Sequence, residues 1–378
     1  MKSAAELARK EVKRLKPCVH GGEVWEIANE TGLNVKDLID FSSSINPLGP
    51  SPRALEAIKN SFEQLPLYPD SNSTSLRKAI ACHFSGINKG NVIVGNGSTE
   101  LIYLFAQVFL KKGDFAVVPA PTFGEYTNAA IRSGSKVKQV KMSRDFQIEP
   151  NVFKRKMERS KVVFLCNPNN PTSMLIPHET LVELLEKARE ENVVVFLDED
   201  FIEFVDNENQ NSFVNTIDKY PNLFILRTFT KFYSLTGLRV GYGIADEETI
   251  EVFSRVKMPW NVNSLAQAAA IAALADEEHS KKSMEVVRSE RKYLSDELSH
   301  VKGFRVFPAD SNFVFIDVRE SGCTAARLRE MMMKYGILVR DCSSFAGLDA
   351  YYVRVAVRTR QENERLLEAF RKVLKHDN

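Results

Sequence analysis

The stretch Arg227-Thr-Phe-Thr-Lys231-Phe-Tyr-Ser-Leu-Thr-Gly-Leu-Arg239 decides how the rest of the chain is interpreted. It begins at the end of the apolar run Leu223–Arg227, which predicts a buried strand. Lys231 is therefore expected just beyond a strand's carboxyl end, where parallel α/β sheets bind their ligands. A lysine amine attacks an aldehyde only when it is neutral, and burial or nearby positive charge lowers its pKa. Arg239 can supply that charge and can also bind a phosphate through two parallel hydrogen bonds.

Two hydroxyl side chains, Thr228 and Thr230, add hydrogen-bond donors beside Lys231. Together these features are typical of a lysine that anchors pyridoxal phosphate covalently. An ordinary strand-to-loop connection that carries Lys and Arg would look the same, so the interpretation depends on finding further sites for the same cofactor.

Composition limits the classes of partner. The 378 residues are 44% hydrophobic and 26% charged, with a net charge of +2, which indicates a globular protein and predicts binding to neither nucleic acid nor membranes. The five cysteines include no Cys-x-x-Cys pair, and the six histidines show no metal-ligand spacing, so no metal site is expected. The N-terminus is too charged for a signal peptide, and no apolar run reaches the ~20 residues that span a bilayer. These features predict a cytoplasmic protein.

Short apolar runs alternate with helical patterns between residues 75 and 260. The clearest helices are expected at Thr99–Leu110 and Glu179–Glu190. Such alternation predicts an α/β fold with a mostly parallel seven-stranded sheet covered by helices on both faces. The expected strands are Asn91–Val94, Phe115–Val118, Val137–Lys141, Val162–Cys166, Val193–Asp198, Leu223–Arg227 and Val240–Gly243.

After residue 263 the pattern changes. One long helix is expected over Ser264–Ser299, followed by a smaller α+β unit. This predicts an N-terminal arm and part of a small domain in residues 1–50, a large cofactor-binding domain in 51–263, and an interdomain helix plus the small domain in 264–378. The later elements are expected at Phe304–Phe307, Phe313–Asp317, Ala325–Tyr335, Ile337–Arg340, Tyr352–Val357 and Gln361–Leu374.

Four further sites suit one molecule of pyridoxal phosphate. Asp198 ends an expected strand, and its carboxylate can keep the pyridine nitrogen protonated. The stretch Gly95–Glu100 lies between a strand and a helix, where backbone amides hold phosphate. Asn170 can reach the ring oxygen, and Phe123 can stack on the ring. Taken singly, each has an ordinary alternative: a cap, a turn residue or a core aromatic.

In this order and spacing, these segments resemble the aspartate-aminotransferase-like fold of pyridoxal phosphate enzymes over nearly the whole chain. Several other segments are similar to those of the threonine-phosphate decarboxylases of cobalamin synthesis, whose nearest cousins are the histidinol-phosphate aminotransferases. The segments that carry the narrower resemblance are His20–Gly22, Asp40–Gly49, Met258–Val262, Arg340–Cys342 and Tyr351–Ala356.

The resemblance implies roles for named residues. Lys231 would be the Schiff-base lysine, Asp198 the pyridinium partner, and Asn170 a contact to the ring oxygen and the substrate. Tyr68 would reach the cofactor phosphate of a neighbouring subunit, which implies a homodimer with shared active sites. The phosphate cup would consist of Ser98, Thr99, Thr228, Thr230 and Arg239.

Substrate contacts are implied at the two ends of the chain. Arg354 would bind the substrate carboxylate, and Arg340 with His20 and Gly21 would bind the substrate phosphate. The implied reaction is decarboxylation of O-phospho-L-threonine to (R)-1-aminopropan-2-yl phosphate, a precursor of the cobalamin nucleotide loop. Decarboxylation requires the carboxylate, rather than the α-hydrogen, to be held perpendicular to the cofactor ring. The alternative is a histidinol-phosphate aminotransferase.

Three residues depart from the patterns of the resembling families. Phe201 stands where transaminases of this fold usually have tyrosine, so one hydrogen bond to the ring oxygen would be absent. Ser44 stands at a possible substrate contact where the decarboxylases commonly have asparagine, and Ser173 replaces a glycine of a loop. A ligand-sensing module of a transcription regulator would need a DNA-binding segment, and the sequence shows no basic helix-turn-helix pattern.

Overall fold

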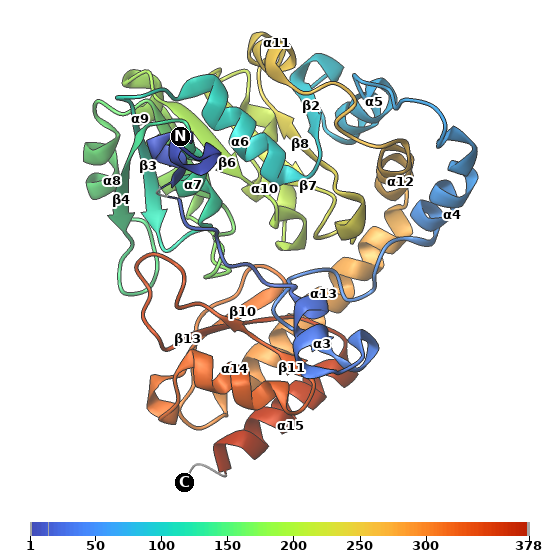
Figure 1. Cartoon of the computed structure of the whole chain (residues 1–378), viewed down its shortest axis with the longest axis vertical. Helices are drawn as coiled ribbons and strands as arrows, with labels where there is room; N and C mark the ends of the chain where they lie inside the picture. The colour runs from blue at the N-terminus through green and yellow to red at the C-terminus, as the bar shows by residue number, and fades with distance from the viewer. Residues whose placement is uncertain (1, 14, 376–378) are drawn as a thin grey trace.

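The computed structural model describes residues 2–13 and 15–375. Its main layer is a seven-stranded sheet with strand order β2-β8-β7-β6-β5-β3-β4, in which only β8 runs antiparallel to its neighbours. Figure 1 shows this sheet in the upper half of the molecule. The strands are β2 (Val92–Gly95), β3 (Phe115–Ala120), β4 (Lys136–Lys141), β5 (Val162–Cys166), β6 (Val194–Asp198), β7 (Leu223–Thr228) and β8 (Gly241–Ile244).

Both faces of this sheet are covered by helices, and this explains the nearly continuous apolar strands. Along β5, Val162 and Phe164 face one hydrophobic core, whereas Val163 and Leu165 face the other. The first core packs against α6 (Ser98–Phe109), α7 (Glu125–Arg132) and α11 (Glu247–Val256). The second packs against α5 (Thr74–His83), α8 (Pro150–Met157), α9 (His178–Glu190) and α12 (Ser264–Leu274). The predicted fold class is therefore confirmed.

A second, four-stranded sheet of order β12-β13-β10-β9 lies below the first in Figure 1. Its neighbouring strands are all antiparallel. The N-terminal strand β1 (Ile39–Asp40) pairs in parallel with β11 (Ile337–Leu338) beside it. The remaining elements are β9 (Arg305–Val306), β10 (Phe313–Asp317), β12 (Arg340–Asp341), β13 (Tyr352–Ala356), α14 (Ala325–Met333) and α15 (Arg360–Lys375).

The expected single helix over Ser264–Ser299 is wrong, because the structure has two helices there. The first, α12, ends at Leu274, and the second, α13, covers Glu277–Ser299. Asp276 caps the second helix by accepting a hydrogen bond from the backbone amide of His279 at 3.3 Å. Figure 1 shows α13 running from the large sheet toward the smaller one, so this helix connects the two parts.

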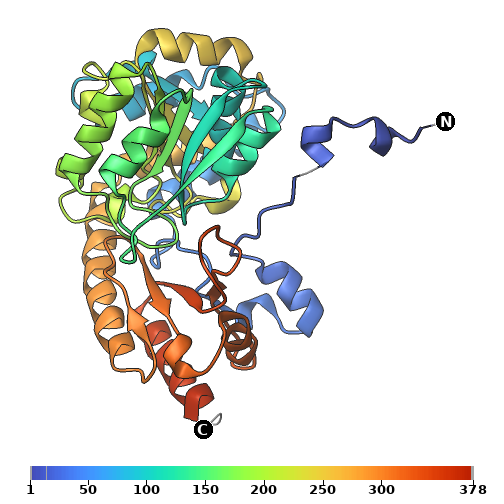
Figure 2. The same cartoon turned by 90° about the vertical axis from the view of Figure 1, so that its left-hand side faces the viewer.

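The N-terminal arm precedes both sheets. Its helix α1 (Ala4–Leu7) lies outside the body of the molecule in Figure 2, whereas α2 (Lys10–Lys13) contacts α7 of the large domain. The chain then returns to the body and enters α3 (Val24–Thr31), which packs beside the smaller sheet. Residues 16–21, which precede α3, pass between the two sheets and line the cavity described next.

Candidate active site

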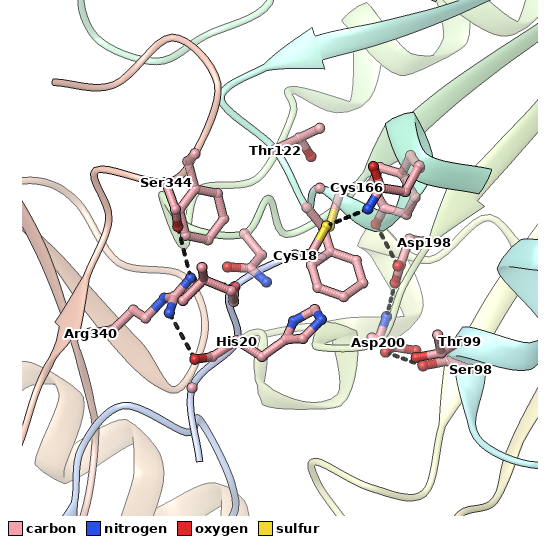
Figure 3. Close-up of a pocket in the computed structure, with 18 of the residues that line it drawn as sticks. Cys18, His20, Ser98, Thr99, Thr122, Cys166, Asp198, Asp200, Arg340 and Ser344 are labelled. Atoms are coloured by element: carbon pink, nitrogen blue, oxygen red, sulfur yellow. Dashed lines mark hydrogen bonds between the residues drawn. The ribbon is translucent and has the colours of Figure 1, made fainter. Parts of the chain in front are cut away.

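A cavity of about 650 Å³ lies between the two sheets. The carboxyl ends of β5, β6 and β7 form one wall, as expected for a parallel α/β sheet. The smaller sheet supplies Arg340 and Arg354, and the arm supplies residues 16–21. Figure 3 shows Arg340 and Ser344 on one side, Asp198, Asp200 and Ser98 on the other, and His20 of the arm between them.

Lys231 lines this cavity three residues after β7 ends at Thr228. Burial lowers the pKa of its amine, and Arg354 and Arg239 lower it further, while Asp200 and Asp198 oppose the shift. The amine lies 5.7 Å from the centre of the Phe201 ring. Because a neutral amine is the nucleophilic form, these surroundings suit a lysine that attacks an aldehyde.

Asp198 ends β6 and is 3% exposed. Its carboxylate accepts hydrogen bonds from the Tyr126 hydroxyl at 2.5 Å and from the backbone amide of Asp200 at 2.9 Å. Burial and the neighbouring Asp200 carboxylate raise the pKa of Asp198 well above its usual value. A cationic partner would offset that cost, so the position suits a protonated pyridine nitrogen.

The proposed phosphate cup surrounds the N-terminus of α6. Gly97 precedes this helix with φ of +80°, and a Cβ there would come within 2.5 Å of Arg239 Nη2. Glycine therefore lets the arginine approach the free amides of a 12-residue helix. Ser98, Thr99 and Thr230 line the same cavity. A guanidinium beside helix amides and hydroxyls is a donor set that fits a phosphate.

Thr228 differs from the rest of the predicted cup. It is completely buried behind Thr230, the two hydroxyl oxygens lie 2.9 Å apart, and it does not line the cavity. The structure therefore places Thr228 as a support for Thr230.

Tyr68 also lies away from the cavity. Its side chain is 80% exposed and packs against Trp260, with ring centres 4.7 Å apart.

Arg354 crosses from the smaller sheet to the wall formed by the large one. It donates hydrogen bonds to the Asn170 side-chain oxygen at 2.5 Å and to the Ser42 carbonyl at 2.7 Å. Burial lowers the pKa of this guanidinium to about 10, so it remains a cation at neutral pH. The predicted substrate contacts Asn170 and Arg354 thus lie together at the cavity.

Arg340 holds the arm in place. Its guanidinium donates to the carbonyl oxygens of Val19 at 2.6 Å and His20 at 2.8 Å, and to the Ser344 hydroxyl at 3.1 Å. An arginine has five N–H donors, so two are left for a ligand. Gly21 is required because a Cβ there would lie 2.3 Å from the Ser42 carbonyl oxygen. The predicted pair His20 and Gly21 therefore reaches the cavity through tight backbone packing.

His20 itself is oriented by groups that the sequence analysis did not foresee. Its Nε2 lies 2.9 Å from Glu125 Oε1, and its ring lies 5.7 Å from the Phe123 ring. The Tyr103 hydroxyl donates to the other oxygen of Glu125 at 2.5 Å. These hydrogen bonds lower the pKa of Glu125, with that to His20 as the largest cause. The first turn of α7 therefore anchors the arm.

Three buried polar atoms at residues lining the cavity have no hydrogen-bond partner within the described residues. They are Ser44 Oγ, Asp200 Oδ1 and Arg354 Nε. Buried polar groups in native proteins are normally paired, so such atoms mark places where a ligand would bind. The cavity therefore fits a polar ligand that offers both hydrogen-bond donors and acceptors, as pyridoxal phosphate and a phosphorylated substrate do.

Sequence reasoning missed several residues of this cavity. Glu125 and Tyr126 lie in the same sequence segment as Phe123. The sequence does not show which distant residues an aromatic or an acidic side chain in a helix will contact. Asp200 lies two residues after Asp198 and Cys18 lies in the arm, and neither had been given a role. Burial raises the pKa of the Cys18 thiol to about 12, so this cysteine stays protonated.

Comparisons with known proteins agree with this geometry. Residues 36–370 match the model of the family "Aminotransferase class I and II", and the chain belongs to this family. The family's enzymes use pyridoxal phosphate, and so does this one. One similar structure is a histidinol-phosphate aminotransferase from Sinorhizobium meliloti in complex with pyridoxal-5'-phosphate, with a TM-score of 0.87 at 21% identity, covering 98% of each chain.

Two further relatives bear on the particular reaction. A histidinol-phosphate aminotransferase from Methanosphaera stadtmanae is 37% identical over 97% of this chain and 98% of its own length. The structure of an L-threonine-O-3-phosphate decarboxylase from Porphyromonas gingivalis has a TM-score of 0.79 at 25% identity, covering 89% of this chain and 99% of its own. Sequence similarity therefore favours the predicted alternative, an aminotransferase, over the decarboxylase that the motifs first suggested. Within the described residues, no helix is long and apolar enough to cross a membrane.

Proposed function

We propose that this pyridoxal phosphate enzyme acts on a small amine that carries a phosphate, and that transfer of the amino group of histidinol phosphate is its reaction. One observation carries the substrate class: Arg354, Arg340 and His20 converge on the cavity that holds Lys231. These donors suit two separate anionic groups. The reaction type follows from the 37% identical relative named as a histidinol-phosphate aminotransferase.

Lys231 and Asp198 divide the chemical work. When bound, pyridoxal phosphate withdraws electrons from a bond to the substrate's amine-bearing carbon. Asp198, fixed by Tyr126, would keep a proton on the ring nitrogen and so maintain that electron demand. Lys231, freed from its covalent role by the substrate amine, would carry a proton between positions on the substrate and cofactor as general base and acid.

The remaining residues orient the reactants. The phosphate cup at α6 would hold one end of the cofactor, and Phe123 would cover its ring. Arg354 would bind a carboxylate, which both 2-oxoglutarate and O-phospho-L-threonine possess. His20, on an arm clamped by Arg340, would face the substrate phosphate. The position of the substrate relative to the ring then selects which bond breaks.

Decarboxylation of O-phospho-L-threonine is the second candidate, and Phe201 favours it. This residue is 5% exposed and packs edge-on against Phe313 with ring centres 5.0 Å apart. No hydroxyl is present there to donate to the ring oxygen, unlike in most transaminases of the fold. The His20–Gly22 segment of the arm also favours decarboxylation, because its sequence is similar to that of the decarboxylases.

Two parallel assays decide between the reactions. The cofactor-loaded protein is given histidinol phosphate and 2-oxoglutarate while glutamate is measured, and separately O-phospho-L-threonine without an oxo acid while carbon dioxide is measured. Glutamate formation without carbon dioxide supports the transaminase, and the reverse result supports the decarboxylase. If neither product forms above the level of a Lys231→Ala control, the proposed substrate class is wrong.

We further propose that two copies of the chain form a homodimer in which Tyr68 reaches the partner's cofactor phosphate. The region around Tyr68 exposes many large apolar side chains, as interfaces do. They include Phe62, Leu65, Leu67, Met258 and Trp260.

Light scattering tests whether the protein is a dimer. Mixing Lys231→Ala protein with Tyr68→Ala protein tests whether the active sites are shared. Activity should reappear in the mixture, because each hybrid dimer contains one site with both residues intact. A monomeric protein, or mixtures that stay inactive, would contradict this arrangement.

A further inference from the structure

Asp200 is a second carboxylate inside the cofactor cavity. Its Oδ2 accepts a hydrogen bond from the Ser98 hydroxyl at 2.8 Å. Its Oδ1 is buried and has no hydrogen-bond partner in the described part of the chain. Figure 3 shows Asp200 beside Ser98 and Thr99, at the N-terminus of α6. An acid at a proposed phosphate site is unexpected, because a carboxylate repels a phosphate.

The hydroxyl of Ser98 cannot serve both groups when Asp200 is ionised. A serine has one proton to donate, and in the structure it points to Asp200. A bound phosphate in the cup would need the same proton. If Asp200 is protonated, it can donate to Ser98 Oγ, and the serine can donate its own proton to the phosphate. The geometry therefore allows a chain of two hydrogen bonds from Asp200 through Ser98 to the phosphate.

The charges around Asp200 point in the same direction. The cations that interact with the Asp200 carboxylate are Lys231 and Arg239. The neighbouring carboxylate is that of Asp198, which accepts a hydrogen bond from the backbone amide of Asp200. Two cations thus face two carboxylates before any phosphate arrives, so an ionised Asp200 would add repulsion to a dianionic phosphate bound beside it. Burial already raises the pKa of Asp200 to about 6, although Ser98 and both cations oppose the shift. Other titratable groups that interact with Asp200 are Glu203 and Cys166.

We propose that Asp200 takes up one proton when the cofactor phosphate binds, so that capture of pyridoxal phosphate by this chain depends on pH. The proposal rests on the phosphate cup and not on which reaction the enzyme performs. Its sign follows from linkage. Below pH 6 Asp200 is already protonated and binding needs no further proton, whereas at higher pH each binding event consumes one, so affinity falls as pH rises.

Pyridoxine 5'-phosphate is a suitable probe, because it carries the phosphate but has no aldehyde to react with Lys231. Its binding to the cofactor-free full chain is measured by calorimetry at pH 8 in two buffers of different ionisation enthalpy, which gives the number of protons taken up. The wild type should take up about one proton more than Asp200→Asn. Between pH 7 and 9, the affinity of the wild type for pyridoxine 5'-phosphate should fall about tenfold per pH unit relative to the affinity of Asp200→Asn.

Two controls separate this effect from damage. Glu251→Gln makes the same change of charge on the exposed surface of α11 and should leave proton uptake at the wild-type value. Asp200→Ala replaces the asparagine variant if that one fails to fold, and both are checked by thermal unfolding. Equal proton uptake by wild type and Asp200 variants would overturn the role of Asp200. If neither protein binds the probe, the phosphate cup itself is wrong, and the proposal fails with it.

Discussion

The two walls of the active-site cavity are built in different ways. The cofactor wall comes from one sheet: Asp198 ends β6, Lys231 follows β7, and both stand at the same edge. The substrate wall joins distant parts of the chain, since Arg340 bonds the carbonyl of His20 from 320 positions away. In the proposed function, the chemistry depends on the ends of two adjacent strands, whereas substrate recognition depends on long-range packing. Changes in the two walls should therefore have different effects.

The strongest test of this contrast is Lys231→Ala in the cofactor wall. We expect kcat to fall by ~10⁴-fold, because the covalent anchor and the proton carrier are lost together. Borohydride reduction followed by peptide mapping should find the pyridoxyl label at position 231 in the wild type and at no lysine in the variant. Lys292→Ala, on the exposed face of α13, is the control. A label at another lysine of the wild type would refute the assignment.

Arg354→Gln tests the substrate wall at a buried arginine. Removing one partner of a buried charged hydrogen bond costs roughly 2–5 kcal/mol, so kcat/KM for a carboxylate substrate should fall ~10²- to 10³-fold. The variant should still bind the cofactor, since Lys231 and the phosphate cup belong to the other wall. Arg327→Gln, half exposed on α14, should behave as wild type. Loss of bound cofactor in Arg354→Gln would show that the two walls are not separable.

Glu125→Gln tests whether the arm acts through the orientation of His20. Losing a charged hydrogen bond of roughly 1.5–3 kcal/mol should raise KM for a phosphorylated substrate at least ~10-fold and leave kcat nearly unchanged. The pKa of Glu125 is held below its ordinary value, so this contribution is present at neutral pH and is lost as pH falls through the lowered pKa. The measurement is KM with phosphorylated and unphosphorylated substrate, with Glu183→Gln on the exposed surface of α9 as the control. Equal effects on both substrates would contradict an interaction with phosphate.

Phe201→Tyr tests the cofactor wall without removing any contact. It should therefore have the smallest effect on kcat of the four variants, ~3-fold or less. A new hydroxyl that donates to the ring oxygen favours its anionic form, so the pH midpoint of the bound cofactor's absorbance should fall by about one unit, equivalent to ~1.4 kcal/mol. Phe62→Tyr, on the exposed surface, should leave the midpoint unchanged. An unshifted midpoint in Phe201→Tyr would place the ring oxygen elsewhere.

The same contrast explains how much the sequence could predict. The seven-stranded sheet was predicted because its strands are continuous apolar runs, and Lys231 and Asp198 because each follows such a run. The bonds of Arg340 to the arm could not be predicted, because backbone carbonyls leave no pattern in a sequence. Thr228 was assigned to the cup although it lies behind Thr230, since hydroxyl residues two apart look equivalent before the strand end is known.

The helix between the sheets shows a different failure. Hydrophobic spacing continues across Ala275, so periodicity alone joined α12 and α13. Asp276 followed by two glutamates is a typical helix start, and weighing that capping pattern against periodicity would have found the break. Local hydrogen-bond chemistry therefore predicted the boundary better than apolar spacing did.

The clamp of Arg340 on the backbone of residues 19 and 20 has an evolutionary consequence. Since those two contacts end on main-chain oxygens, positions 19 and 20 can change their side chains without losing the hydrogen bonds to Arg340. If the arm contacts the substrate as proposed, a gene lineage can thus alter which metabolite is accepted by mutating a few N-terminal codons, while the residues proposed to hold the cofactor are inherited unchanged.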